Sequence, residues 1–306
     1  YTHMLDDEGM VRADFTVFRM ADRCRLVNGA DAGPRDLIYM RRMAQDKGWD
    51  VTITDVTEKF TTIGIWGPNA RENLKKVVAA PEELDIENFP FAAIRQISIA
   101  GKTVTAFRIS YVGEQGWELH MRYEDGLAVW DALRGIGVMA VGVETYANSR
   151  RLEKSLRLQN ADLHTQYNLI EAALARPKVK EADFRGKAKH VEYRERDHQP
   201  AMLCTLVMTD NIDANGVARY PVGNLPVMDP DTGKTLIDEL GRRSYTTSIA
   251  FGPSIGKNIA LAYLPWDYCQ EGRKLTVSYF DEIYPVEVVG IGYKPLYDPE
   301  NLKPRS

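Results

Sequence analysis

Three stretches of the sequence place carboxylates, aromatic rings or cations where they could take part in chemistry. The first is MVRADFTVF, residues 10–18, which alternates apolar and polar residues at the period of a β-strand. Asp14 lies in the middle of it, although aspartate is disfavoured inside strands. A carboxylate there could take up a proton or stabilise a cation. The open alternative is a carboxylate on a solvated face beside Arg12.

The second stretch is YVGEQGWEL, residues 111–119, in which a glycine-containing turn separates Tyr111 from Trp117 and Glu118. Alternation places Glu118 and His120 on one face of a strand and Trp117 on the other, where it suits a core. A carboxylate and an aromatic ring at one reversal of the chain could form one wall of a ligand pocket. The open alternative is a polar outer face. If the stretch lines a ligand pocket instead, Glu114 in the turn is the structural one of the two glutamates.

The third stretch is SRRLEKSLRL, residues 149–158, in a predicted helix. Arg151 and Lys154 are three residues apart and share a side of that helix. They could bind an anionic group, or balance buried carboxylates. The alternative is a solvated basic helix in which Glu153 and Arg157 form an ordinary surface pair.

Several motifs for other chemistries are absent from the sequence. There is no GxGxxG, HExxH or GxSxG, and GPSIGKN lacks the spacing and the Ser or Thr of a phosphate-binding loop. The five histidines show no helical spacing of metal ligands, so no metal site is expected, while one assembled by the fold stays open. Three widely separated cysteines without CxxC spacing favour a reducing compartment, the cytoplasm or a mitochondrial matrix.

The composition is that of a globular chain without a nucleic-acid or membrane partner. Hydrophobic residues make up 44% and charged residues 27% of 306 residues, enough for two or more compact units. The net charge of −4, with both signs interspersed, gives no basic footprint for nucleic acid. No apolar run approaches the roughly 20 residues that span a bilayer.

The periodicity predicts an α+β domain over residues 1–175, a charged linker over 176–200, and an all-β barrel or sandwich over 201–306. In the first domain, strands are predicted at 10–18, 24–29, 51–56 and 61–67, with a hairpin at 94–111. Helices are predicted at 33–48, 69–78, 124–137 and 143–158. In the last domain, strands are predicted at 201–208, 242–251, 258–264, 274–280 and 284–293.

Taken in order, the motifs resemble one known family. YTHMLDDEGMVRADFTV, GPNAR, YVGEQGWEL, RRLEKSLRL, ADFRGK and RRSYTTS are similar to the glycine-cleavage T-protein (aminomethyltransferase) superfamily. Within it, the chain is most similar to the folate-binding half of dimethylglycine and sarcosine dehydrogenases and oxidases. The resemblance implies a tetrahydrofolate-binding α+β unit followed by a β-rich domain.

The resemblance also implies roles for single residues. Asp14 matches the family's catalytic aspartate. Five further positions match folate contacts or residues that line the pocket: Tyr1, Val27, Tyr111, Glu118 and Arg151. The sequence departs from the family pattern where Ser155 replaces a glycine and Arg150 replaces a leucine.

The function implied is capture of the one-carbon unit of an N-methylated amine as 5,10-methylenetetrahydrofolate. FAD is implied only for an upstream amine dehydrogenase domain, in the same chain or in a partner subunit. Because the chain begins within strand-like sequence and without methionine, we expect it to be the C-terminal part of a longer protein. The alternatives are a stand-alone aminomethyltransferase, a folate-dependent demethylase, or a non-catalytic folate-binding module.

Overall fold

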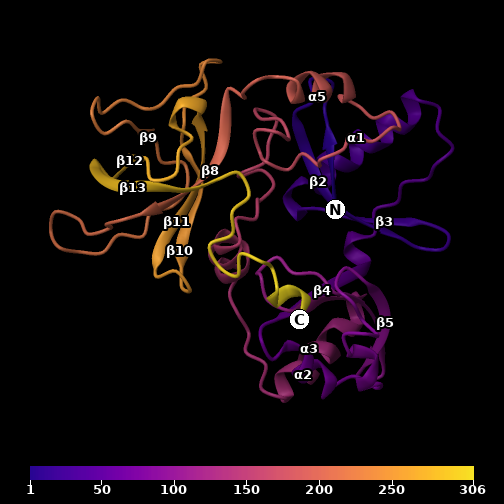
Figure 1. Cartoon of the computed structure of the whole chain (residues 1–306). Helices are drawn as coiled ribbons and strands as arrows, with labels where there is room; N and C mark the ends of the chain where they lie inside the picture. The colour runs from indigo at the N-terminus through magenta and orange to yellow at the C-terminus, as the bar shows by residue number, and fades with distance from the viewer. The chain divides into compact units, whose positions relative to one another are not determined.

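The computed structural model describes residues 1–306, the side chain of Ala30 excepted. The contacts within the chain divide it into two compact units. Unit 1 consists of Tyr1–Ile53 and Ser155–Pro295, and unit 2 consists of Thr54–Lys154 and Leu296–Ser306. The secondary structure of both units is drawn in Figure 1. Short 3₁₀ helices occur at Ala30–Ala32, Thr57–Lys59, Pro81–Leu84, Tyr123–Asp125, Trp266–Tyr268 and Lys303–Arg305.

Unit 1 begins with a three-stranded antiparallel sheet in the order β1-β2-β3. Its strands are β1 (Thr2–Leu5), β2 (Val11–Arg19) and β3 (Cys24–Val27), and helix α1 (Gly33–Asp46) follows. The predicted strands and helix are confirmed. Strict alternation along residues 10–18 would place Val17 in the core with Val11, Ala13 and Phe15, but Val17 is 40% exposed and Phe18 only 5%. Val17 pairs with Leu26, which is also exposed. No other described part of the chain therefore covers this face of the sheet at the β2–β3 end.

The charged segment 176–200 contains helix α5 (Lys187–Arg194) and contacts the turn between β1 and β2. The Tyr193 hydroxyl donates to the carbonyl of Glu8 at 2.9 Å, and Arg185 pairs with Asp7. A Cβ on Gly9 would lie 3.2–3.3 Å from atoms of α5, which leaves little room for a side chain there. The predicted domain boundaries at 175 and 201 stay a prediction.

The rest of unit 1 is a six-stranded sheet in the order β10-β11-β8-β13-β12-β9, with every pair antiparallel. Figure 1 shows its long strands side by side. The strands are β8 (Ala201–Met208), β9 (Val227–Met228), β10 (Thr246–Gly252), β11 (Lys257–Pro265), β12 (Lys274–Tyr279) and β13 (Glu282–Ile291). The predicted all-β region is confirmed, and with it the α+β class followed by a β-rich C-terminal domain.

Unit 2 is built on a four-stranded antiparallel sheet in the order β4-β7-β6-β5. The strands are β4 (Phe60–Trp66), β5 (Ile94–Ile99), β6 (Lys102–Phe107) and β7 (Gly116–Arg122), and the helices include α2 (Ala70–Lys75) and α3 (Gly126–Gly135). The predicted β5–β6 hairpin turns at Ala100-Gly101, both with positive φ, as a two-residue hairpin loop requires. The strand predicted at 51–56 is wrong, because the segment pairs with no strand and Val51 is exposed.

The helix predicted over 143–158 is shorter and differently wound than expected. A π-helical turn covers Thr145–Arg150, and a single α-turn, α4 (Arg151–Glu153), follows it. The chain then leaves the helix at Ser155, which has a φ of 55°. A left-handed residue ends a helix and suits glycine, the residue that the resembled family has there.

The C-terminal segment of unit 2 is held by buried cations. Lys154, almost fully buried, donates its Nζ to the carbonyls of Tyr297 at 3.0 Å and Asp298 at 2.7 Å. Arg108 donates to the carbonyl of Phe89 at 2.5 Å and bonds also to the carbonyl of Ser306. Burial lowers the pKa of Arg108 to about 10.

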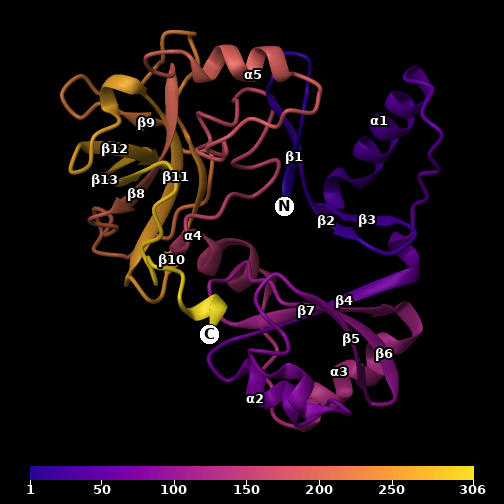
Figure 2. The same ribbon diagram turned by 45° about the vertical axis from the view of Figure 1, so that its right-hand side comes forward.

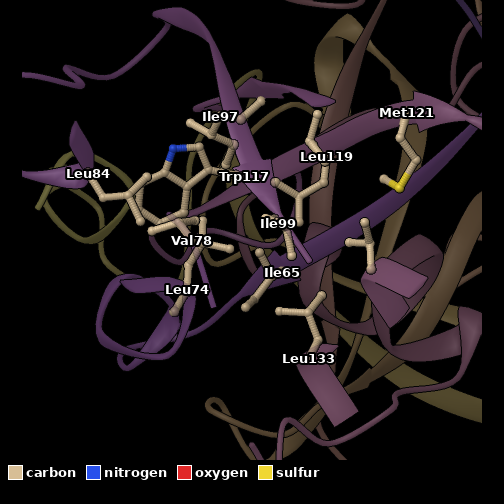
Figure 3. Packing of buried hydrophobic residues seen from close by; sticks show 14 of the residues in the cluster. Ile65, Leu74, Val78, Leu84, Ile97, Ile99, Trp117, Leu119, Met121 and Leu133 are labelled. Carbon is tan, nitrogen blue, oxygen red and sulfur yellow. The ribbon is translucent and has the colours of Figure 1, made fainter. Parts of the chain in front are cut away.

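The core of unit 2 lies between the sheet and helices α2 and α3, which occupy the same side of it in both views (Figures 1 and 2). Figure 3 shows Trp117 and Leu119 of β7 packed among Leu74 of α2 and Leu133 of α3. Trp117, Leu119 and Met121 are at most 1% exposed. Since successive strand residues point to opposite faces, Glu118 and His120 face away from this core. The predicted alternation of residues 117–121 is confirmed.

Leu119→Ala should lower the free energy of unfolding by about 2–5 kcal/mol, because it removes a fully buried side chain from this core. The matched control is Leu127→Ala on α3, where the leucine is 70% exposed and the change should stay within about 0.5 kcal/mol. Urea unfolding followed by tryptophan fluorescence measures both. Equal effects of the two substitutions would contradict the packing described.

Candidate functional site

In unit 1, the register of the three-stranded sheet gathers three of the predicted site residues on one face. His3 pairs with Asp14, and Thr16 pairs with Val27, so these four side chains point to the same side. Tyr1 reaches the same carboxylate, since its hydroxyl donates to Asp14 Oδ2 at 2.6 Å. We call Tyr1, His3, Asp14 and Val27 the aspartate group.

The environment of Asp14 favours its protonated form. Burial raises the pKa of its carboxyl above the ordinary 3.8, while the hydrogen bond from Tyr1 opposes that rise. The negative charge of Asp36 also raises the pKa of Asp14, by a smaller amount. Asp14 therefore has the properties of a carboxylate that is a better base than one in water.

His3 lies directly opposite Asp14 and supplies no positive charge to it at neutral pH. Burial, followed by the nearby Arg176, lowers the pKa of His3 to about 4. Its Nε2 is buried and makes no hydrogen bond within the described residues. Arg176 itself donates to the carbonyl of Tyr1 at 2.7 Å, which anchors the start of the first strand.

In unit 2, the face of the sheet opposite the core carries a linked row of polar side chains. The His120 Nε2 lies 3.2 Å from Glu118 Oε2, and its Nδ1 lies 3.1 Å from the Thr62 hydroxyl. His120 is 5% exposed, whereas the Glu118 side chain is 17% exposed. Glu118 thus has one oxygen engaged by the protein while part of its carboxylate reaches the surface.

Three aromatic rings accompany this carboxylate. Trp66 and Tyr146 stack with ring centroids 5.2 Å apart, and Tyr111 lies 5.4 Å from Tyr146. The Trp66 indole is fixed by its Nε1, which donates to the carbonyl of Ile109 at 2.9 Å. Burial, and then the negative charge of Glu118, raises the pKa of Tyr146 to about 12, which places Tyr146 within electrostatic reach of Glu118.

Two glycines leave the space in which Trp66 can lie flat against the sheet. Gly64 pairs with Glu118, and a Cβ on Gly64 would lie 2.0 Å from the Trp66 ring. A Cβ on Gly116 would lie 2.0 Å from the carbonyl oxygen of Ile65. Glycine is therefore required at both positions. We call Thr62, Trp66, Tyr111, Glu118, His120 and Tyr146 the glutamate group.

Arg151 is fully buried and bonds to the backbone next to Tyr146 of the glutamate group. Its Nε donates at 2.7 Å to the carbonyl of Ala147, within the π-helical turn that carries Tyr146. Non-α turns of this kind often occur at functional sites. The alternative of a solvated basic helix is wrong, because Arg151, Glu153 and Lys154 are all buried.

Glu114 and Glu153 are engaged by the neighbouring arginine instead of being available to a ligand. Arg150 contacts Glu114 at 3.0 Å and Glu153 at 2.6 Å. The Tyr297 hydroxyl also donates to Glu114 at 2.6 Å. These contacts agree with a structural role for Glu114.

Trp66 and Tyr146 were missed by reasoning from sequence alone. Strand pairing could have found Trp66, which lies two residues beyond Gly64 on the face that holds Glu118. No comparable signal marks Tyr146, because its orientation depends on a π-helical turn.

The glutamate group fits a flat heterocycle that carries N–H donors. An ionised carboxylate accepts two parallel N–H groups, and aromatic rings pack against a planar ligand. The pterin ring of tetrahydrofolate has this chemistry. Among the described residues, no cluster of His, Cys, Asp and Glu could hold a metal ion. No helix in the described part of the chain is long and apolar enough to cross a membrane.

Comparison with known proteins identifies the family. Residues 1–178 match the family model described as the GCVT N-terminal domain. The chain belongs to the glycine cleavage T-protein family. Residues 223–298 match its second model, the glycine cleavage T-protein C-terminal barrel domain. The family predicted from the sequence motifs is confirmed.

Curated relatives include proteins of different lengths. Human mitochondrial dimethylglycine dehydrogenase is 31% identical over 295 residues, covering 94% of this chain and 32% of that protein. The chain thus spans about a third of the dimethylglycine dehydrogenases that it matches. The aminomethyltransferase of Picosynechococcus sp. is 28% identical over 301 residues, covering 97% of this chain and 76% of that protein.

A solved structure supports the fold. The crystal structure of glycine cleavage system aminomethyltransferase T from Bartonella henselae superposes with a TM-score of 0.76. The superposition covers 96% of this chain and 75% of the Bartonella henselae chain, at 20% sequence identity. At this identity the likeness shows that the two share a fold.

Asp14→Asn should raise the thermal midpoint at pH 7. Because burial raises the pKa of Asp14 in the folded state, ionising it costs stability at every pH above that pKa. Asparagine carries no charge and can still accept from Tyr1, so the gain should shrink as pH falls and vanish below 3.8.

Calorimetry of both proteins from pH 3 to pH 8 measures this difference. The control is Asp22→Asn, an exposed aspartate paired with Arg23, which should show no gain at pH 7. A lower midpoint for Asp14→Asn at pH 7 would show that the charged carboxylate stabilises the fold.

Proposed function

We propose that this protein binds tetrahydrofolate and passes to it the one-carbon unit of an N-methylated amine of the dimethylglycine or sarcosine type. The product is 5,10-methylenetetrahydrofolate. The observation that carries the proposal is the Glu118 carboxylate, whose side chain is 17% exposed, in a group with three aromatic rings on the face of the sheet opposite the core. Membership of the glycine cleavage T-protein family supports it.

Binding of the ring is assigned to the glutamate group. Glu118 accepts N–H groups at the edge of the pterin, and Tyr111 packs against its plane. Arg151 contributes by holding the turn that carries Tyr146, through its bond to Ala147. Within the aspartate group, Tyr1 and Val27 are assigned as folate contacts, as the family resemblance implies.

Proton transfer is assigned to Asp14. Tetrahydrofolate, when bound, supplies the N5 and N10 nitrogens that accept the one-carbon unit. The Asp14 carboxylate takes up the proton that an amine nitrogen releases, and its negative charge stabilises an iminium cation. Burial favours this role, because a raised pKa makes Asp14 a stronger base. The Tyr1 hydroxyl orients the carboxylate through its 2.6 Å hydrogen bond.

The oxidised amine is proposed to come from an FAD-dependent amine dehydrogenase domain, in the same polypeptide or in a partner subunit. The supporting observation is the match to the dimethylglycine dehydrogenases, of which this chain covers 32%. FAD is assigned to that domain alone.

A stand-alone aminomethyltransferase is the second candidate. The observation that favours it is the match over 97% of this chain to an aminomethyltransferase of which it covers 76%. The amine donor separates the two. An aminomethyltransferase takes its unit from an aminomethyl carrier, whereas the first candidate needs an amine oxidised by a flavin enzyme.

Two substitutions should separate binding from chemistry. Glu118→Gln should weaken tetrahydrofolate binding about 10- to 100-fold, because hydrogen bonds to a charged acceptor are lost. Asp14→Asn should leave affinity within about threefold and slow formation of 5,10-methylenetetrahydrofolate about 10²- to 10⁴-fold. Isothermal titration gives the affinity, and product formation during dimethylglycine oxidation by a flavin dehydrogenase gives the rate.

The matched control is Glu124→Gln, just after β7, where the glutamate side chain is 59% exposed. It should change neither quantity. Unchanged affinity in Glu118→Gln would remove that residue from the binding site, and unchanged turnover in Asp14→Asn would remove Asp14 from the mechanism.

A further inference from the structure

The row Thr62–His120–Glu118 links two strands across the face that carries the glutamate group. Thr62 of β4 pairs with His120 of β7, and Gly64 pairs with Glu118. The two hydrogen bonds of the row, at 3.1 and 3.2 Å, use both ring nitrogens of His120. The histidine therefore sits between a hydroxyl and a carboxylate, with neither nitrogen left to water.

The distances alone leave the tautomer of His120 open, so the direction of the row is assigned for an ionised Glu118 and a neutral His120. An ionised carboxylate can only accept, so the Nε2 of His120 must carry the proton that it donates to Glu118. In a neutral imidazole, Nδ1 is then an acceptor, and the Thr62 hydroxyl supplies the proton. The Thr62 hydroxyl thus donates to His120, and His120 donates to Glu118.

Packing holds the imidazole in this plane. The ring of Phe107 meets His120 edge to face, with centroids 4.3 Å apart and an interplanar angle of 90°. His120 is 5% exposed, so its ring has little room to rotate. Glu118 consequently receives a hydrogen bond from a fixed direction before any ligand arrives.

We propose that His120 and Thr62 are positioning residues, which hold the Glu118 carboxylate ready for the paired N–H donors of a 2-amino-4-oxopyrimidine ring. This rests on the proposed function, and it adds the two residues that position the Glu118 carboxylate. A glutamate held in place loses less rotational freedom on binding, so affinity rises. Each carboxylate oxygen has a second lone pair, so the bond from His120 leaves capacity for the ligand.

A double-mutant cycle tests whether His120 acts through Glu118. In the wild-type background, His120→Leu should weaken tetrahydrofolate binding about tenfold, measured by isothermal titration. In the Glu118→Gln background, the same change should alter affinity less than about twofold, because its target is gone. His120→Gln, whose amide can still donate to Glu118, should stay within about threefold of wild type.

Substitution of Thr62 gives a second test, which disturbs the fold less than substitution of His120. Thr62→Ser keeps the hydroxyl and should retain affinity, while Thr62→Val removes the donor and should weaken binding several-fold. In the ligand-free protein, nitrogen chemical shifts of His120 should show the Nε2–H tautomer in wild type and Thr62→Ser. This measurement does not depend on folate.

The outcomes distinguish the two proposals. If the wild type binds tetrahydrofolate but His120→Leu weakens binding equally in both backgrounds, the histidine is only a packing residue and the positioning role is overturned. The Nδ1–H tautomer in the free protein would overturn it as well. If the wild type does not bind tetrahydrofolate while the tautomer is as expected, the proposed function fails, and with it the ligand assigned to this row.

Discussion

The strict alternation of side chains along β7 is the constraint on which the candidate site of unit 2 depends. Burying Trp117, Leu119 and Met121 against α2 and α3 forces Glu118 and His120 to the opposite face. A slip of one residue would exchange the two sets and expose the largest side chain of the core. The stability of unit 2 and the placement of its carboxylate therefore have the same physical origin.

Five carboxylates of the protein differ in the kind of partner that contacts them. Glu114 and Glu153 are contacted by Arg150, and Glu171 by Arg242, so permanent positive charges engage them. Asp14 instead accepts from the hydroxyl of Tyr1, and Glu118 is hydrogen-bonded to a histidine. A carboxylate without a fixed cation keeps its charge available for a ligand or a proton, which agrees with the roles proposed for Asp14 and Glu118.

Much of this could be predicted from the sequence because it depends on local patterns. The alternation of 117–121, the hairpin at Ala100-Gly101 and the strands after residue 200 follow from periodicity and turn residues. The order of the motifs along the chain predicted the family. Strand register, which no local pattern specifies, was needed to place Val27 on the face of Asp14.

Other features could not be predicted, for identifiable reasons. The β-branched residues of 51–56 favour a strand, but no neighbouring strand pairs with them. Arg151 was expected to bind an anionic group or to balance buried carboxylates, and no sequence pattern indicates that its Nε bonds to the carbonyl of Ala147. The stacking of Trp66 on Tyr146 joins residues 80 positions apart and depends on the bare backbone at Gly64.

The central claim is that Glu118 recognises the N–H edge of a pterin. The most direct measurement compares the affinity of the protein for tetrahydrofolate with its affinity for an analogue in which a methyl group replaces the 2-amino group. The account predicts a loss of about tenfold or more for the analogue, because one of two charge-assisted hydrogen bonds disappears. It also predicts that Glu118→Gln makes little distinction between the two ligands. Equal binding of both ligands by the wild type would contradict it.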